Sequence, residues 1–243
     1  MGTVTLHLGQ AYSRAWKAFK KNAGIHIAVF FLVFILSFIT IPLVEYGRLF
    51  FFVHLLINVA ITLFIVGYTV AAVKSDVINI GTIIADSLSF KKFFQYFLYY
   101  IAMFIIVGGV LATFVMLGFS GQIIFSQDFF YQIEMPPAIY LWLFLAFIIL
   151  MIYVSLRLMF VLYFIVENDD DFISAIQHSW EVTGGNVFTL FLFGLTAIPL
   201  FILSLITFGL GFLVVFPLLY LVQAVMYLTL KKAIEPGAEE PVT

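Results

Sequence analysis

The chain has 243 residues, of which 64% are hydrophobic and only 10% are charged, and its formal net charge is −2. Soluble domains carry about 25% charged residues, and a water-soluble fold of this length could not hide so much apolar surface. The composition therefore predicts an integral membrane protein. It excludes a nucleic-acid partner, because the few basic residues lie beside apolar stretches, and the lack of cysteine excludes disulfides and thiolate metal sites.

Six apolar stretches are long enough to cross a bilayer as helices, since a crossing needs about 20 apolar residues. Their uninterrupted apolar character favours an all-α fold over the alternating strands of a membrane barrel. Only a turn around Phe208 and Gly209 separates the last two, which predicts a tight helical hairpin. In chain order, the predicted spans are 23–44, 49–74, 92–118, 138–166, 186–206 and 209–231.

A polar and basic segment, 5–20, precedes the first span and is typical of an amphipathic helix lying at the membrane interface. Its aromatic side chains can dip into the acyl boundary, while its lysines can reach headgroup phosphates. Two interpretations stay open: an elbow that orients the first span, and an element that recognises lipid. No cleavable signal peptide is expected, because no short apolar stretch ends in a small-residue cleavage site.

Short amphipathic segments also precede the third and fifth spans, which predicts three repeats of an interfacial helix followed by a helical hairpin. Three pairs of identical residues relate the first and third segments at a constant shift: Ala11 and Ala175, Trp16 and Trp180, Asn22 and Asn186. The middle copy keeps only the spacing of Ala85 and Phe90. The predicted pseudo-repeats are 5–74, 78–166 and 170–232 within a single membrane domain, 1–234, followed by a short cytoplasmic tail, 235–243. The predicted interfacial anchors are Trp16, Lys17, Lys20, Lys21 and Phe90.

The basic residues predict that both termini are cytoplasmic, by the positive-inside rule. If the spans alternate, nine Lys and Arg residues fall on one side and only Arg48 falls on the other. The connector 167–185 on the basic side is acidic and has no Lys or Arg, but acidic residues count little in this rule. The nine are Arg14, Lys17, Lys20, Lys21, Lys74, Lys91, Lys92, Lys231 and Lys232.

Arg157 is the one charge embedded in a predicted span, and a charge in the membrane marks a candidate functional site. Glu167, the run Asp169–Asp171 and Glu181 are its candidate partners. Two interpretations stay open: a structural tie to the following helix, and a contact with a substrate or lipid headgroup. The aspartates are expected to cap a helix that starts near Phe172 rather than bind a metal. The candidate ligand or headgroup residues are Arg157, Glu167, Trp180 and Asn186.

Nothing in the sequence has the pattern of a catalytic or metal site. No two of the four histidines stand at i and i+4, and no nucleophile-elbow, phosphate-loop or dinucleotide motif occurs. We therefore expect no catalytic residues, no metal, no cofactor and no enzymatic activity. The loop 119–137, which is aromatic and acidic, is the candidate partner-contact surface outside the membrane. Four polar residues deep in the spans are expected to bridge helices by hydrogen bonds: Asn58, Thr62, Ser204 and Gln223.

From Arg157 to about Lys232, an embedded arginine and an acidic connector precede an Ala-x3-Ser-Trp helix, a Gly-Asn break and a terminal hairpin. The residues that carry this pattern are Arg157-Leu158, Val166-Glu167, Ala175, Ser179-Trp180, Gly185-Asn186, Gly209, Gly211, Pro217 and Tyr227. The pattern resembles a set of bacterial multi-pass families that includes the membrane domain found with glycerophosphoryl diester phosphodiesterases. This resemblance implies a bacterial inner-membrane protein. No catalytic activity carries over from it, because no phosphodiesterase domain is found beside the spans.

Two functions are compatible with these features. The first is an accessory or scaffold protein that assembles with other membrane-protein subunits, as sparse buried polarity and short loops indicate. The alternative is a carrier or flippase-like protein for a lipid or another hydrophobic or anionic substrate, with Arg157 meeting the anionic group. The lipid bilayer is the expected partner in both cases.

Overall fold

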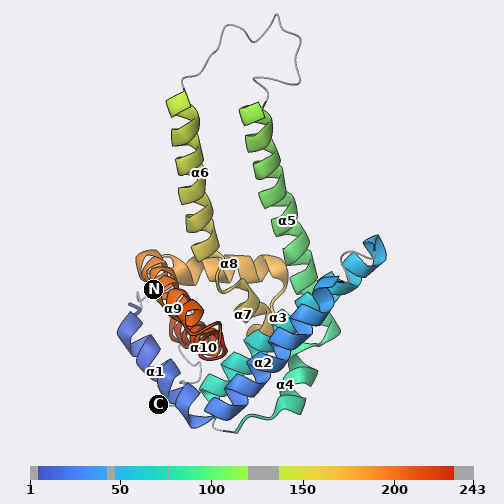
Figure 1. The fold of residues 1–243 in the computed structure, drawn as a ribbon, viewed down its shortest axis with the longest axis vertical. Coiled ribbons are helices and arrows are strands. Elements are labelled where there is room, and N and C mark those ends of the chain that lie inside the picture. Colours follow the sequence, from blue (N-terminus) through green and yellow to red (C-terminus); the bar gives the residue numbers. More distant parts are fainter. Residues whose placement is uncertain (1–4, 43–46, 76, 120–136, 233–243) are drawn as a thin grey trace, which may run out of the picture. The chain divides into compact units, whose positions relative to one another are not determined.

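The computed structural model describes residues 5–42, 47–75, 77–119 and 137–232 (Figure 1). All regular secondary structure in these ranges is helical, and six helical stretches are long and apolar enough to cross a membrane. The predicted all-α, six-span fold is therefore confirmed. The loop 119–137 that was predicted to contact partners, apart from its two ends, and the tail 235–243 lie outside the described residues.

The chain divides into two compact units, Met1–Tyr96 with Leu156–Thr243, and Phe97–Ser155. The second unit contains most of α5 (Phe90–Phe119) and α6 (Pro137–Arg157), which run antiparallel (Figure 1). The remaining helices belong to the first unit: α1 (Leu8–Lys21), α2 (Ala23–Thr40), α3 (Arg48–Lys74), α4 (Ile80–Ser87), α7 (Val161–Asn168), α8 (Phe172–Thr183), α9 (Val187–Ile206) and α10 (Phe212–Lys231). The prediction of a single membrane domain stays a prediction.

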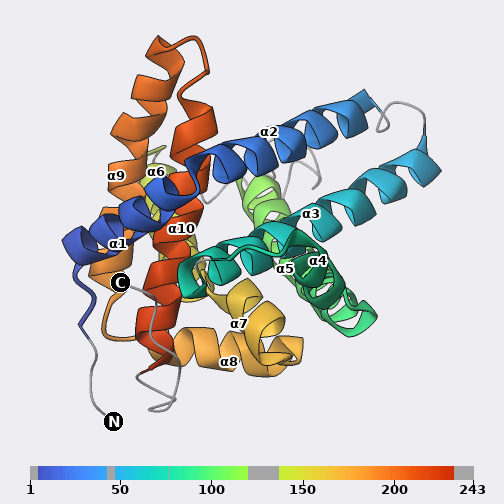
Figure 2. The same cartoon turned by 90° about the horizontal axis from the view of Figure 1, so that it is seen from below.

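Helix α10 is the centre of the first unit. In its most apolar stretch 61% of the residues are buried, against 22% for α2 and 17% for α9. It packs against α1, α2, α3 and α9, and Figure 2 shows it between α9 and the α2–α3 hairpin. Bulky side chains pack tightly where α10 meets α7, with the rings of Phe164 and Tyr227 5.1 Å apart. The outer faces of the other spans stay apolar and exposed, as side chains that face lipid do.

Span boundaries agree with the prediction to within a few residues, except in the fourth. One continuous helix, 138–166, was expected there. In the structure the helix is interrupted between Arg157, where α6 ends, and Val161, where α7 begins. The last hairpin has the predicted turn: Phe208 and Gly209 both adopt positive φ, 54° and 86°. Gly209 is suited to this conformation because it has no Cβ.

Three of the four intramembrane polar residues that were predicted to bridge helices bond within their own helix instead. The Asn58 amide donates to the His54 carbonyl at 2.8 Å. The hydroxyls of Thr62 and Ser204 likewise donate to carbonyls four residues earlier, each at 2.8 Å. Short side chains reach their own preceding turn most easily, so local bonds win. Only Gln223 follows the prediction, since its Oε1 accepts a bond from the Tyr163 hydroxyl of α7 at 3.4 Å.

Two histidines do join helices. His26 of α2 is fully buried, and its Nδ1 lies 2.7 Å from the Tyr68 hydroxyl of α3. At the far end of the same hairpin, His54 Nδ1 lies 3.0 Å from the carbonyl oxygen of Thr40. These contacts tie α2 to α3 at both ends and satisfy polar groups that lipid would leave unpaired.

Three short helices, α1, α4 and α8, each precede a pair of longer helical stretches. The first and third share the burial of Ala11 and Ala175, but Ala85 in the middle is exposed. Phe90 opens α5 instead of lying on the short helix as the repeat required. The three-repeat organisation is therefore not confirmed.

Candidate functional site

The break between α6 and α7 is held by side chains from α8. The Ser179 hydroxyl donates to the Arg157 carbonyl at 2.8 Å and accepts from the Phe160 amide at 3.3 Å. The Thr183 hydroxyl lies 3.4 Å from the same Arg157 carbonyl. A helix that stops inside an apolar environment leaves carbonyl and amide groups without partners. Ser179 and Thr183 supply those partners, so α8 makes the break possible.

The Arg157 side chain lies against the C-terminal part of α8 and is only 8% exposed. Its guanidinium carbon stands 4.4 Å from the centroid of the Trp180 ring, which is a cation–π distance. Gly184 leaves room for it: a Cβ there would lie 3.1 Å from an Nη atom of Arg157. Arg157, Trp180 and Gly184 therefore form a close-packed joint between the end of α6 and the end of α8.

Glu167, an expected partner of Arg157, pairs instead with two lysines. Its carboxylate forms an ion pair with Lys74 at the end of α3 and lies 4.0 Å from the ammonium of Lys231 at the end of α10. Lys231 also donates to the side-chain carbonyl of Asn168. All three charged groups are only partly exposed, so their attraction is less screened than that of a surface pair. Glu167 thus joins the ends of α3, α7 and α10.

The three aspartates that follow have separate partners. Asp169 contacts two lysines. Its carboxylate forms an ion pair with the Lys92 ammonium at 3.4 Å, and its backbone carbonyl accepts a hydrogen bond from the Lys91 ammonium at 2.7 Å. Asp170 lies 2.7 Å from His178 Nδ1. Asp171 caps α8, as predicted, by accepting from the amides of Ile173 and Ser174.

Hydrogen bonding also sets the protonation of Asp171. The Ser174 hydroxyl donates to its carboxylate at 2.6 Å, and together with the capping amides this lowers the pKa of Asp171 below its ordinary value. The capping carboxylate therefore stays charged to a lower pH than an ordinary aspartate.

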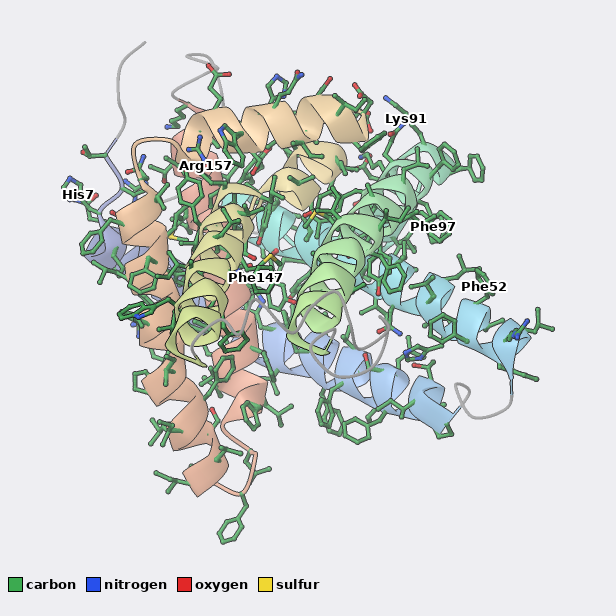
Figure 3. All side chains as sticks on the ribbon, turned by 90° about the horizontal axis from the view of Figure 1, so that it is seen from above. His7, Phe52, Lys91, Phe97, Phe147 and Arg157 are labelled. Carbon is green, nitrogen blue, oxygen red and sulfur yellow. The ribbon has the colours of Figure 1, made fainter. Side chains whose placement is uncertain are left out.

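Asn186 bonds to the segment before α1. It is 7% exposed, and its Oδ1 accepts a hydrogen bond from the Leu6 amide at 2.9 Å. This bond attaches the segment before α1 to the start of α9. Of the four candidate ligand residues, the structure thus brings together Arg157 and Trp180 and gives Glu167 and Asn186 other partners. Figure 3 shows Arg157 and Lys91 near opposite ends of α8.

The predicted interfacial anchors divide between two helices. Trp16, Lys17, Lys20 and Lys21 lie on α1 and are exposed, whereas Phe90 is the first residue of α5 and is also exposed. Sequence reasoning missed Ser179, Thr183 and Gly184 as the residues that support the helix break. It also missed the lysine partners of the acidic connector. The signal for those was present, because the positive-inside assignment already placed Lys74, Lys91, Lys92 and Lys231 on the same side as the connector.

These features define a class, a multi-pass α-helical integral membrane protein. Residues 128–234 match the family model described as the membrane domain of glycerophosphoryl diester phosphodiesterase. The matched region contains α6 to α10, and it confirms the resemblance that the sequence pattern carried from Arg157 onward. It also begins earlier than that pattern. No curated protein and no solved structure matches the chain.

Proposed function

We propose that this protein is a non-enzymatic scaffold subunit of the bacterial inner membrane, which assembles with other membrane-protein subunits. The observation that supports this proposal is the joint around Arg157. The Arg157 carbonyl is held by Ser179 and Thr183, and the guanidinium stacks on Trp180 of the same chain, as a structural tie requires. A membrane protein whose polar groups serve its own fold offers partners its apolar outer faces instead.

Helix α9 has an outer face that could receive a partner helix. Outside its contact with α10, Ile198 and Ile202 are exposed, and nothing lies within 4 Å of a Cβ added to Gly194. Helices in lipid associate through close packing, which a small residue such as glycine permits. We therefore expect a partner helix to cross α9 at Gly194.

The experiment that tests this proposal compares co-purification of subunits with the parent chain and with two variants, each extracted in its native lipid. Gly194→Leu fills the open position without touching the chain's own core, and it should reduce the yield of co-purifying subunits at least tenfold. Ile202→Leu changes an exposed apolar residue to another one and should leave the yield unchanged. A parent chain that purifies alone in native lipid would contradict the proposal.

One observation favours the second candidate, a carrier for an anionic lipid or other anionic substrate. Trp180, on which the Arg157 guanidinium stacks, is 40% exposed. An anionic headgroup could therefore approach the edge of this pair. In the carrier function, Arg157 supplies the positive charge and Trp180 holds it in position.

Reconstitution separates the two candidates. If the chain is a carrier, the parent protein in lipid vesicles moves a labelled anionic lipid between leaflets. Arg157→Lys should then retain part of this movement, because it keeps the charge, and Arg157→Gln should abolish it. If the chain is a scaffold, none of the three proteins moves lipid. Both Arg157 variants then lower the stability of the protein instead, through loss of the stacked guanidinium.

A further inference from the structure

Helix α1 has one face fixed to the rest of the chain. Ala11, Ala15 and Phe19 are buried where α1 packs against α10. The Tyr12 hydroxyl lies 2.6 Å from the Thr196 hydroxyl of α9, which adds a polar tie to a second helix. With these contacts α1 cannot roll about its axis, so the chain itself determines which residues face outward.

The outward face combines one aromatic ring with several cations. Trp16 is 42% exposed, and its ring stacks on Phe19 at 5.5 Å. The Lys20 ammonium stands 5.9 Å from the centroid of the Trp16 ring, while Lys17 and Lys21 are also exposed. The Trp16 ring is thus held by its neighbours with cations around it.

No carboxylate of the N-terminal region offsets these charges. The first acidic residue of the chain is Glu45, well beyond α1. Within the described part of the chain, Arg14, Lys17 and Lys20 form no ion pair. The lysines of the other helices differ, since Lys74 and Lys92 pair with Glu167 and Asp86. The positive charges of Arg14, Lys17 and Lys20 are therefore available to a ligand from outside the chain.

The place of α1 identifies that ligand. The first span, α2, begins at Ala23, two residues after the end of α1, and the chain changes direction between them (Figure 1). Lys20 and Lys21 therefore stand where a membrane-crossing helix meets the aqueous phase. Phosphates of lipid headgroups occupy that level, and tryptophan prefers the same depth.

We propose that the outward face of α1, formed by Arg14, Trp16, Lys17, Lys20 and Lys21, binds the headgroups of anionic phospholipids in preference to zwitterionic ones. The basic side chains attract the headgroup charge, and Trp16 keeps them at headgroup depth. Each basic residue near an anionic surface adds about a fivefold preference at low ionic strength. This inference does not depend on the scaffold proposal, because it concerns the lipid around the chain and not a protein partner.

Fluorescence of Trp16 tests the proposal in the full-length protein. Replacing Trp142 and Trp180 by Phe leaves Trp16 as the sole tryptophan of the three. This protein is placed in phosphatidylcholine vesicles that contain a minor fraction of brominated phosphatidylglycerol or, in the matched sample, brominated phosphatidylcholine. Bromine quenches tryptophan on contact, so the ratio of quenching reports which lipid lies against α1. We expect at least a fivefold preference for phosphatidylglycerol that falls in about 1 M salt, where the Debye length is about 3 Å.

Charge variants make the outcome decisive. Changing Arg14, Lys17, Lys20 and Lys21 together to Gln should bring the quenching ratio to about one, whereas changing the three lysines to Arg should preserve the preference. The double variant Lys17→Gln with Lys20→Gln should give an intermediate ratio, and it keeps the test valid if the fourfold variant does not fold. Equal quenching by the two lipids in the parent, or an unchanged ratio in the double variant, would overturn the proposal. Equal quenching would favour an acidic protein segment as the ligand of α1 instead.

Discussion

Individual polar residues in this protein have different uses: some bond within their own helix, some join two helices, and Ser179 supports a break in another helix. The hydroxyl groups of Thr62 and Ser204 donate to the preceding turn of the same helix. Ser179 bonds instead to both sides of the break between α6 and α7. A continuous helix pairs its own backbone amide and carbonyl groups, whereas an interrupted helix needs neighbouring side chains to pair the groups at the break.

Removing the Ser179 hydroxyl should therefore destabilise the protein. Ser179→Ala leaves the Phe160 amide without this acceptor and deprives the Arg157 carbonyl of its closest donor. We expect a loss of about 1–3 kcal/mol in the free energy of unfolding. Reversible unfolding in mixed detergent micelles measures it. Ser13→Ala, at an exposed position of α1, is the control and should change stability by less than about 0.5 kcal/mol. Equal stability of the two variants would show that the break does not depend on Ser179.

The cap formed by Asp171 gives a pH dependence with a defined sign. Hydrogen bonds from Ser174 lower its pKa in the folded state, so the charged form contributes stability above the ordinary aspartate pKa of 3.8. That contribution is lost as the pH falls through the lower pKa of the folded state. Asparagine also caps helices but does not titrate. The melting temperature of Asp171→Asn should therefore fall less than that of the parent between pH 5 and the parent's acid limit. Parallel curves would contradict the assignment.

At the scale of helices, the acidic residues at the end of α7 and just after it join elements that are distant in sequence. Glu167 pairs with lysines at the ends of α3 and α10, and Asp169 pairs with Lys92 near the start of α5. The Gln95 Oε1 of α5 also accepts a hydrogen bond from the Phe172 amide at 3.0 Å. The connector has no Lys or Arg of its own, and its lysine partners lie on other helices. Its acidity is compatible with the side of the membrane that the positive-inside rule assigns.

Close packing between α3 and α4 is testable at Gly67. A Cβ at this position would overlap the Ser87 hydroxyl of α4 and lie 3.4 Å from Val166 Cγ1 of α7. We therefore expect Gly67→Ala to destabilise the protein by about 1–3 kcal/mol, as overpacking does. Gly194→Ala is the matched control, since an added Cβ there meets nothing within 4 Å. The control should be neutral or gain up to about 1 kcal/mol from helix propensity. A stable Gly67→Ala protein would mean that α4 packs differently.

For the whole molecule, orientation in the membrane is the property with the widest consequences. The chain has no cysteine, so single cysteines can report the side of the bilayer without a background signal. Ser13 on α1 and Phe208 in the α9–α10 turn are both exposed, and the predicted topology puts them on opposite sides.

We expect a membrane-impermeant maleimide added to intact bacterial cells to label Phe208→Cys and not Ser13→Cys. Inverted membrane vesicles should reverse the pattern. The parent chain, which should not react, is the control. Labelling of both cysteines from the same side would refute the six-span topology, and the reverse pattern would place the termini outside the cytoplasm.

The sequence by itself determined the features that depend on neighbouring residues. Apolar length predicts the six spans, the turn at Phe208 and Gly209 predicts the last hairpin, and Asp171 predicts the start of α8, because each depends on local hydrogen bonding or solvation. Only the tertiary structure decided that the fourth span breaks after Arg157, that Ser179 supports the break, and that Glu167 serves Lys74 and Lys231. These outcomes depend on contacts between residues far apart in the chain. Local pattern carries no information about which of several possible partners is nearest.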